Sequence, residues 1–213
     1  MPFSAQHIKS ARLHLQKSDP VMKRLLKQVG PFTVKAKRDR FATLVSSIVS
    51  QQISTSAART IRQRLVDAVT ERSAFAKHQT IGITPTGLLL FDIDELRQLG
   101  VSRQKATYLL DLAEKVDTES VNLQSISRLS DEDAIEVLIQ VKGIGRWTAQ
   151  MFLMFSLARL DVLPVDDLGI KNAIQKNYQL ADLPNGEKIE TIAKPWRPYA
   201  TIASWYLWQS LDS

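Results

Sequence analysis

The chain has 213 residues, of which 28 are Lys or Arg and 22 are Asp or Glu, so its formal net charge is +6. Hydrophobic residues make up 44%, which excludes wholesale disorder, and the absence of cysteine excludes disulfides, iron–sulfur clusters held by thiolates and cysteine nucleophiles. There is no apolar run long enough for a membrane span and no secretory signal in residues 1–16, so a cytoplasmic (nucleoid) or, in a eukaryote, nuclear location is expected. The positive charge favours a nucleic-acid partner, although a merely solubilising surface would have the same composition.

Helical periodicity runs through nearly the whole chain. Phe41, Leu44, Val45 and Ile48 have the spacing of one helix face, and further segments predict helices over residues 54–71, 104–116, 130–139, 145–159, 170–178 and 199–211. Residues 83–87 and 162–167 are short and contain proline, so they are predicted to be loops. We therefore expect an all-α protein of about ten helices joined by short loops.

The most informative segment is VKGIGRWTA, residues 141–149, which joins two predicted helices. Gly143 and Gly145 allow a tight turn and a close approach of the backbone to a partner. The second helix would direct free amides and the positive end of its dipole at a phosphate, with Lys142 and Arg146 beside it. A plain helical corner with glycines for packing is the alternative; the basic residues and Trp147 favour the phosphate site.

This arrangement, followed by an acid in a Pro-Val-Asp-Asp context, resembles the helix-hairpin-helix DNA glycosylase superfamily. The stretches that carry the resemblance occur in the family's order: SSIVSQQIS (46–54), LGVSRQKATYLLDLA (99–113), VKGIGRWTAQMF (141–152), VLPVDDLGIKNAI (162–174) and KPWRPYATIASWYLW (194–208). The nearest branch is DNA-3-methyladenine glycosylase II, in a short form. The resemblance implies two helical lobes, residues 1–40 with 141–213 and residues 41–140, with a DNA-binding cleft between them.

The resemblance places a catalytic carboxylate at Asp167, facing Trp147 across a flipped nucleotide. A fixed carboxylate would stabilise the oxocarbenium-like sugar that forms as an N-glycosidic bond breaks. The structural alternative is that Asp166 and Asp167 are both acids of a helix start, one of them a cap, and Asp166 is assigned a structural role. Lys171 is interpreted as an i, i+4 partner of Asp167. Trp147 stands where strand-cleaving relatives have a nucleophilic lysine, which implies a monofunctional enzyme that leaves an abasic site.

An N-alkylated purine carries a positive charge and is a good leaving group, so an aromatic pocket can select it by stacking and cation–π attraction. Trp147 and Trp196 match the family's pocket positions, Met151 replaces a tyrosine there, and Trp205 and Trp208 are interpreted as core. The predicted function is base-flipping release of alkylated purines, of the 3-methyladenine and 7-methylguanine type, from double-stranded DNA. A non-catalytic protein that binds alkylation damage or abasic sites on the same fold is the alternative.

The resemblance also implies the DNA contacts. Gln52 occupies the place of the wedge that fills the vacated stack, or is a helix-terminal cap. Ser102 and Lys105 are either phosphate contacts or a capped, solvated helix start. The hairpin contacts are Lys142, Gly143, Gly145, Arg146 and Thr148. No cofactor is required, a Na⁺ or K⁺ ion on the carbonyls of Ile139, Val141 and Ile144 is implied by relatives, and a monomer is expected.

Overall fold

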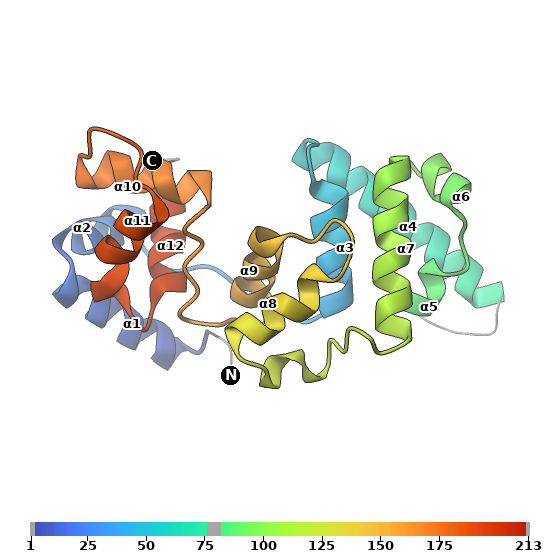
Figure 1. Ribbon diagram of the computed structural model, residues 1–213, viewed down its shortest axis with the longest axis horizontal. Helices are drawn as coiled ribbons and strands as arrows, with labels where there is room; N and C mark the ends of the chain where they lie inside the picture. The colour runs from blue at the N-terminus through green and yellow to red at the C-terminus, as the bar shows by residue number, and fades with distance from the viewer. Residues whose placement is uncertain (1–2, 76–81, 212–213) are drawn as a thin grey trace. The chain divides into compact units, whose positions relative to one another are not determined.

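The computed structural model describes residues 3–75 and 82–211, and its regular structure within these ranges is entirely helical (Figure 1). The α-helices are, in chain order, α1 (Ala5–Ser18), α2 (Pro20–Val29), α3 (Arg40–Ser50), α4 (Thr55–Phe75), α5 (Pro85–Leu88), α6 (Ile93–Gln98), α7 (Arg103–Asp117), α8 (Asp131–Ile139), α9 (Arg146–Phe155), α10 (Leu168–Tyr178), α11 (Gly186–Ala193) and α12 (Ala200–Gln209). Two 3₁₀ helices, η1 (Ser125–Arg128) and η2 (Lys194–Trp196), complete the set. The predicted all-α class is confirmed, and none of the described helices has the length and apolar character to cross a bilayer.

Many helices begin where the sequence supplies a polar cap. The Ser102 and Ser130 hydroxyls accept from the third amide of α7 and α8, and the Asp19 carboxylate accepts from two amides of α2. Asp92 and Glu95 form a reciprocal capping box at α6. Each such cap satisfies amides that lack a partner inside the helix, so these boundaries follow from local sequence.

One predicted loop is partly helical. Residues 83–87 were expected to be a loop because of their proline, but Pro85–Leu88 forms the single turn α5. The Thr84 hydroxyl accepts from the Gly87 amide at 3.1 Å, and proline is tolerated in a first turn because its missing amide would have no helical partner there. Residues 162–167 contain no helix, as predicted.

Contacts divide the chain into a terminal unit, Met1–Ala36 with Leu153–Ser213, and a central unit, Lys37–Phe152. The predicted boundaries, at residues 40 and 140, are therefore corrected to 36 and 152. The hairpin moves into the central unit because it is bonded to α3 and α7: the Gln51 side chain donates to Gly143 O at 2.8 Å, and the Lys142 amide donates to Asp111 at 2.9 Å.

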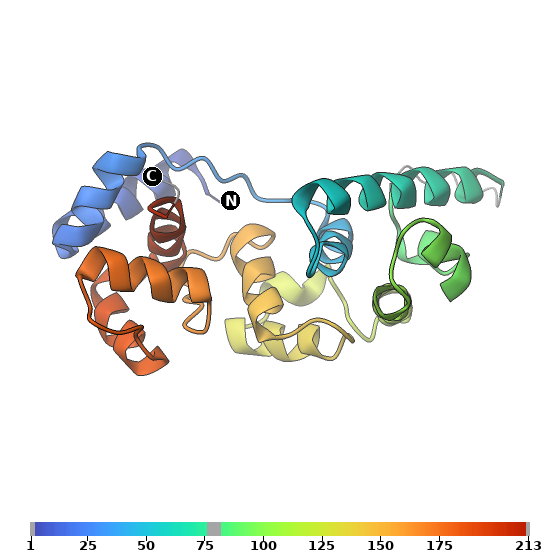
Figure 2. The same cartoon turned by 90° about the horizontal axis from the view of Figure 1, so that it is seen from above.

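Each unit has its own buried apolar core. In the terminal unit α12 is buried along nearly its whole length and packs on α2 and α10, with Trp196 and Tyr206 completely enclosed. In the central unit α3 packs against α4 and α7, and Leu44 and Ile48 of α3 are fully buried. Figure 2 shows the long helix α4 starting beside α3 and running toward α6.

Candidate functional site

The hairpin between α8 and α9 has a backbone conformation that requires glycine at the first of its two glycine positions, Gly143. Gly143 has φ +80°, and a Cβ atom placed there would lie 2.1 Å from the Tyr108 ring. A Cβ on Gly145 would meet nothing within 4 Å, so the backbone there faces open space. The first intrahelical bond of α9 runs from the Ala149 amide to Gly145 O at 3.0 Å, and the amides before it lie outside the helical ladder. This turn therefore has the geometry that suits an anion.

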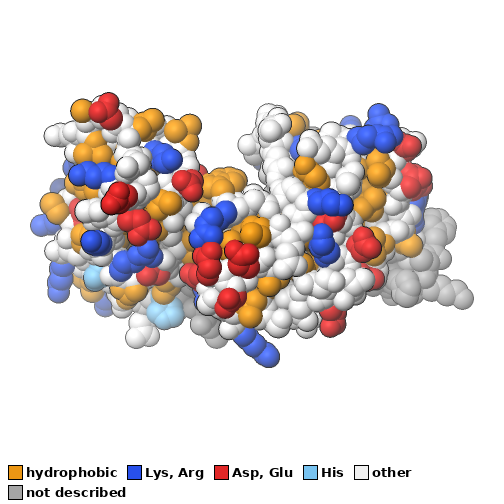
Figure 3. Space-filling model, viewed as in Figure 1, with side chains coloured by type: hydrophobic (Ala, Val, Ile, Leu, Met, Phe, Trp, Pro, Cys, Tyr) orange, Lys and Arg blue, Asp and Glu red, His pale blue; other side chains and the backbone are white. Residues whose placement is uncertain are grey.

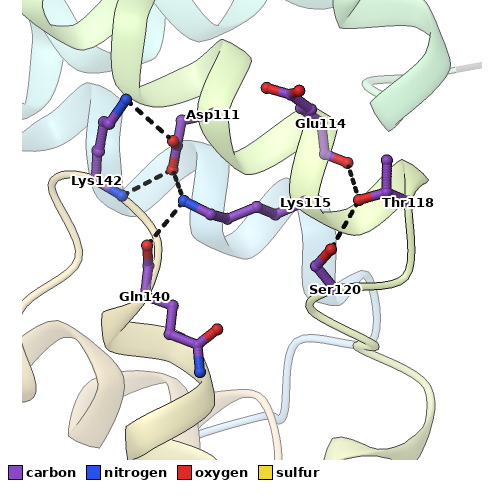
Figure 4. Close-up of polar contacts among 7 residues, drawn as sticks. All are labelled: Asp111, Glu114, Lys115, Thr118, Ser120, Gln140 and Lys142. Carbon is purple, nitrogen blue, oxygen red and sulfur yellow. Dashed lines mark hydrogen bonds and ion pairs between the residues drawn. The ribbon is translucent and has the colours of Figure 1, made fainter.

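Asp111 of α7 anchors the hairpin (Figure 4). Its carboxylate accepts from the Lys142 amide at 2.9 Å and from Lys115 Nζ at 2.7 Å, while Lys115 also donates to Gln140 O at 2.9 Å. Partial burial alone would raise the pKa of Asp111, but the hydrogen bonds from Lys115 and Lys142 outweigh it and hold that pKa below its ordinary value. The ionised carboxylate thus fixes the hairpin backbone against α7.

Both basic residues predicted to bind phosphate at the hairpin have acidic neighbours. Lys142 Nζ lies 3.5 Å from Asp111 Oδ1 and remains largely exposed, whereas Arg146 is held by two hydrogen bonds to Glu132, at 2.6 and 2.7 Å. The Arg146 guanidinium lowers the pKa of the Glu132 carboxyl. Figure 3 likewise shows basic and acidic side chains interspersed on this face of the central unit. The positive charge of both hairpin side chains is therefore partly offset by neighbouring carboxylates.

Lys105 stabilises the loop between α3 and α4, a role that sequence reasoning missed. Its ammonium donates to Val49 O at 2.7 Å and to Gln51 O at 2.6 Å, and partial burial lowers the pKa of Lys105. The predicted phosphate contact is therefore corrected: this side chain closes the C-terminal end of α3. No local pattern marks this role, because Lys105 is far in sequence from both carbonyls.

Gln52 lies exposed at the tip of that loop with φ +55°. Among the residues that the structure describes, its side-chain amide makes no hydrogen bond, and the last residue of α3 is Ser50. The helix-cap alternative is therefore not supported, whereas an exposed amide on a fixed loop fits the wedge. Ser102 is the N-cap of α7, and the side chain of Thr148, which is predicted to contact DNA, is buried.

The predicted base-pocket residues fall into two groups. Trp147 is 49% exposed on α9, and Met151, four residues later on the same face, is half-buried. Trp196, in contrast, has no exposed surface, and its Nε1 donates to the buried Asp19 carboxylate at 2.9 Å. The pocket assignment of Trp196 is therefore wrong: this indole is a core residue of the terminal unit.

Asp167 is the N-cap of α10 in the terminal unit. Its Oδ1 accepts from the Ile170 amide at 2.7 Å and from the Trp208 indole at 2.8 Å, and the side chain is half-buried. A Cβ on Gly169 would lie 3.0 Å from both Asp167 Oδ1 and Trp208 Cδ1, so a glycine here keeps the approach of the indole open. Two donors on one oxygen hold the carboxylate in a single orientation.

The neighbours of Asp167 correct two expectations. Lys171 Nζ pairs at 4.0 Å with the exposed Asp166 and not with Asp167, as i, i+4 spacing had suggested. Trp208, interpreted from sequence as core, is half-buried and bonded to Asp167. The signal that could have found it is weak: an apolar helix with two tryptophans three residues apart does not show which indole reaches a distant carboxylate.

The chain is similar in sequence to known DNA repair proteins. The profile described as "HhH-GPD superfamily base excision DNA repair protein" matches residues 45–198. An alkylbase DNA glycosidase-like protein of Schizosaccharomyces pombe is 32% identical over 204 residues, which cover 94% of this chain and 92% of the relative. DNA-3-methyladenine glycosylase 1 of the same yeast is 34% identical over 204 residues, covering 94% of this chain and 86% of that protein.

A solved structure gives the same result in three dimensions. The S. pombe 3-methyladenine DNA glycosylase in complex with abasic DNA aligns with a TM-score of 0.79 and 33% identity, covering 96% of this chain and 97% of the other. The region matched by the family profile includes the hairpin and Asp167. The resemblance inferred from the sequence is confirmed, and the chain belongs to the HhH-GPD superfamily of base excision DNA repair proteins.

Proposed function

We propose that this protein is a monofunctional DNA glycosylase that flips alkylated purines out of duplex DNA and releases them by hydrolysis. Its similarity to proteins named as 3-methyladenine DNA glycosylases, one of them solved with abasic DNA, supports this substrate class. The observation that carries the proposal is the fixed carboxylate of Asp167, oriented by the Ile170 amide and the Trp208 indole. A polyanionic substrate of this kind also fits a net charge of +6 and a nucleoid or nuclear location.

Asp167 would act on the sugar. When the bond between C1′ and the base nitrogen breaks, its electron pair leaves with the alkylated base and positive charge develops on the deoxyribose. A preoriented carboxylate stabilises that charge without having to reorganise, and it can orient the water that adds to C1′. The base already carries a positive charge, so little general acid is required for its departure.

Trp147 accounts for the remaining features of the proposed reaction. Its exposed indole offers a face for stacking and cation–π attraction to a cationic purine, and Met151 extends that surface with a polarisable side chain. An indole cannot form a Schiff base with the opened sugar, so the strand is left intact. Gln52 would occupy the space that the flipped nucleotide vacates.

We also propose a monovalent cation at the hairpin and a monomeric enzyme. The ligands of the ion would be the carbonyl oxygens of Ile139, Val141 and Ile144. The Val141 carbonyl accepts one hydrogen bond, from the Ile144 amide at 3.0 Å, and retains a second lone pair. Neutral carbonyl oxygens suit Na⁺ or K⁺, and the ion would supply positive charge beside a bound phosphate.

The proposed function is tested by a base-release assay on duplex DNA treated with a methylating agent. We expect chromatography to show free 3-methyladenine or 7-methylguanine, and the DNA strand to remain intact until the abasic sites are cleaved with alkali. Tight binding to the damaged duplex without any released base would support the non-catalytic alternative. Strand cleavage without alkali would contradict the monofunctional assignment.

Trp208→Phe should slow base release by about 10-fold or more, since a hydrogen bond to a charged group contributes about 1.5–3 kcal/mol and Asp167 would lose one. The measurement is the single-turnover rate at saturating enzyme, together with DNA affinity and melting temperature, neither of which should change comparably. Trp205→Phe is the matched control, because it removes an indole from the same helix without touching Asp167. An unchanged rate in Trp208→Phe would show that this indole does not position the carboxylate.

A further inference from the structure

A cavity of about 350 Å³ lies between the last turns of α3 and the first turns of α4. All of its lining residues belong to the central unit, and none comes from the hairpin or from α7. It adjoins the loop that carries Gln52, because Ser50 and Thr55 on its wall flank that loop. The cavity is therefore separate from the anion site at the hairpin and close to the proposed wedge.

Among the described residues, three cations and no acid line this cavity: Lys37, Arg59 and Arg62. The two arginines are three residues apart on α4 and so share a helix face, where like charges destabilise the helix. Within the described ranges neither guanidinium has a hydrogen bond or an ion pair. The same unit pairs Arg72 with Glu95 and Arg146 with Glu132, whereas no described acid neutralises the two cavity arginines.

Hydroxyl groups complete the wall of the cavity. Ser47 and Ser50 donate to carbonyls within α3, at 3.0 and 3.1 Å. Ser46 and Thr55 have no side-chain hydrogen bond to any described residue, so their hydroxyl protons are available to a ligand. Guanidinium groups together with hydroxyl donors match the geometry and the charge of a phosphate group.

We propose that this cavity, the α3–α4 basic pocket, binds one backbone phosphate of the DNA. The inference rests on the proposed function, because it takes the phosphodiester from the DNA that the enzyme would repair. A phosphate held here would give the duplex a second attachment beside the Gln52 loop, independent of the hairpin. Phosphate contacts fix the register of a protein on DNA, so the pocket would help to align the damaged nucleotide with the loop.

The test measures binding, without base release, to a duplex that contains a stable abasic-site analogue. Arg59→Ala/Arg62→Ala should weaken binding about 10-fold at moderate salt and reduce the slope of log K against log salt by about 0.9, the value for one phosphate contact. The control is Arg97→Ala: this arginine on α6 is paired with Asp94 at 3.0 Å, and α6 lies toward the far end of α4 (Figures 1 and 2). We expect its slope to equal that of the wild type.

A second arm identifies the strand that supplies the phosphate. Phosphates of each strand are replaced one at a time by neutral methylphosphonates, and affinity is measured for the wild type and the double variant. The proposal requires a position, on one strand or the other, where neutralisation weakens wild-type binding but not that of the double variant. It is overturned if no position does so, if the double variant keeps the wild-type slope, or if Arg97→Ala loses as much. Because no base release is measured, a failure of the proposed chemistry would appear separately, in the wild-type assay.

Discussion

Asp167→Asn is expected to slow base release by about 100- to 1,000-fold, because the substitution removes the negative charge that stabilises the developing cation on the sugar. The fold should be retained, since asparagine is as good an N-cap as aspartate and can still accept from the Ile170 amide. DNA affinity should not fall, because a negative charge near the backbone is removed. The measurement is the single-turnover release of methylated purines, with binding to an abasic-site analogue measured in parallel.

Asp166→Asn is the matched control for this prediction. Asp166 has the same charge and the adjacent position, but its side chain is exposed and its partner is Lys171, at 4.0 Å. Its replacement should leave the rate of release nearly unchanged. Comparable losses in the two variants would indicate a general electrostatic effect of the segment, and a full rate in Asp167→Asn would remove this carboxylate from the mechanism.

The largest effect on stability is expected at Asp19. This buried carboxylate accepts from the amides of Val21 and Met22, from the Tyr178 hydroxyl at 2.5 Å and from Trp196 Nε1 at 2.9 Å. Burial and the hydrogen bond to Asp19 raise the pKa of Tyr178, so this hydroxyl remains a neutral donor. Asp19→Ala removes a helix cap and leaves the buried Trp196 indole and the half-buried Tyr178 hydroxyl without an acceptor, which should lower the free energy of unfolding by about 3 kcal/mol.

Urea denaturation followed by circular dichroism measures this change, with Asp182→Ala as the control at an exposed position. The control should stay within about 0.5 kcal/mol of the wild type. Binding and base release by Asp19→Ala, measured at a temperature where it remains folded, should be retained. A loss of less than about 1 kcal/mol would mean that water or a rearranged side chain satisfies the donors of Tyr178 and Trp196.

Tryptophan roles show where sequence reasoning was limited. The sequence predicts that Trp196 lines the pocket and that Trp208 lies in the core. In the structure Trp196 is the enclosed indole, bonded to Asp19, and Trp208 is the more exposed one, bonded to Asp167. Both indoles follow apolar or proline-containing segments that look alike in composition. The two indoles differ because Trp196 bonds to a carboxylate 177 residues away in the chain and Trp208 to one 41 residues away. A local sequence pattern cannot predict contacts over such separations.

The partners of the basic side chains could not be predicted from the sequence either. Lys105 and Arg146 carry the charge expected of phosphate contacts, yet one closes the end of α3 and the other pairs with Glu132. In contrast, no sequence pattern singles out Arg59 and Arg62 in a helix rich in arginine, and only their shared cavity distinguishes them. A basic side chain is long and flexible, so its partner is decided by which groups the packing brings within reach.

The sequence by itself determined the helical class, the capped helix starts, the glycine hairpin and Asp167 at the beginning of α10, since each depends on contacts within a few residues. The superfamily also followed from motifs in a characteristic order. Only the tertiary structure decided that the hairpin belongs to the central unit, that Trp208 orients Asp167 and that two arginines share a cavity. Those outcomes depend on packing between segments far apart in the chain, where side-chain reach and burial, not local propensity, select the partners.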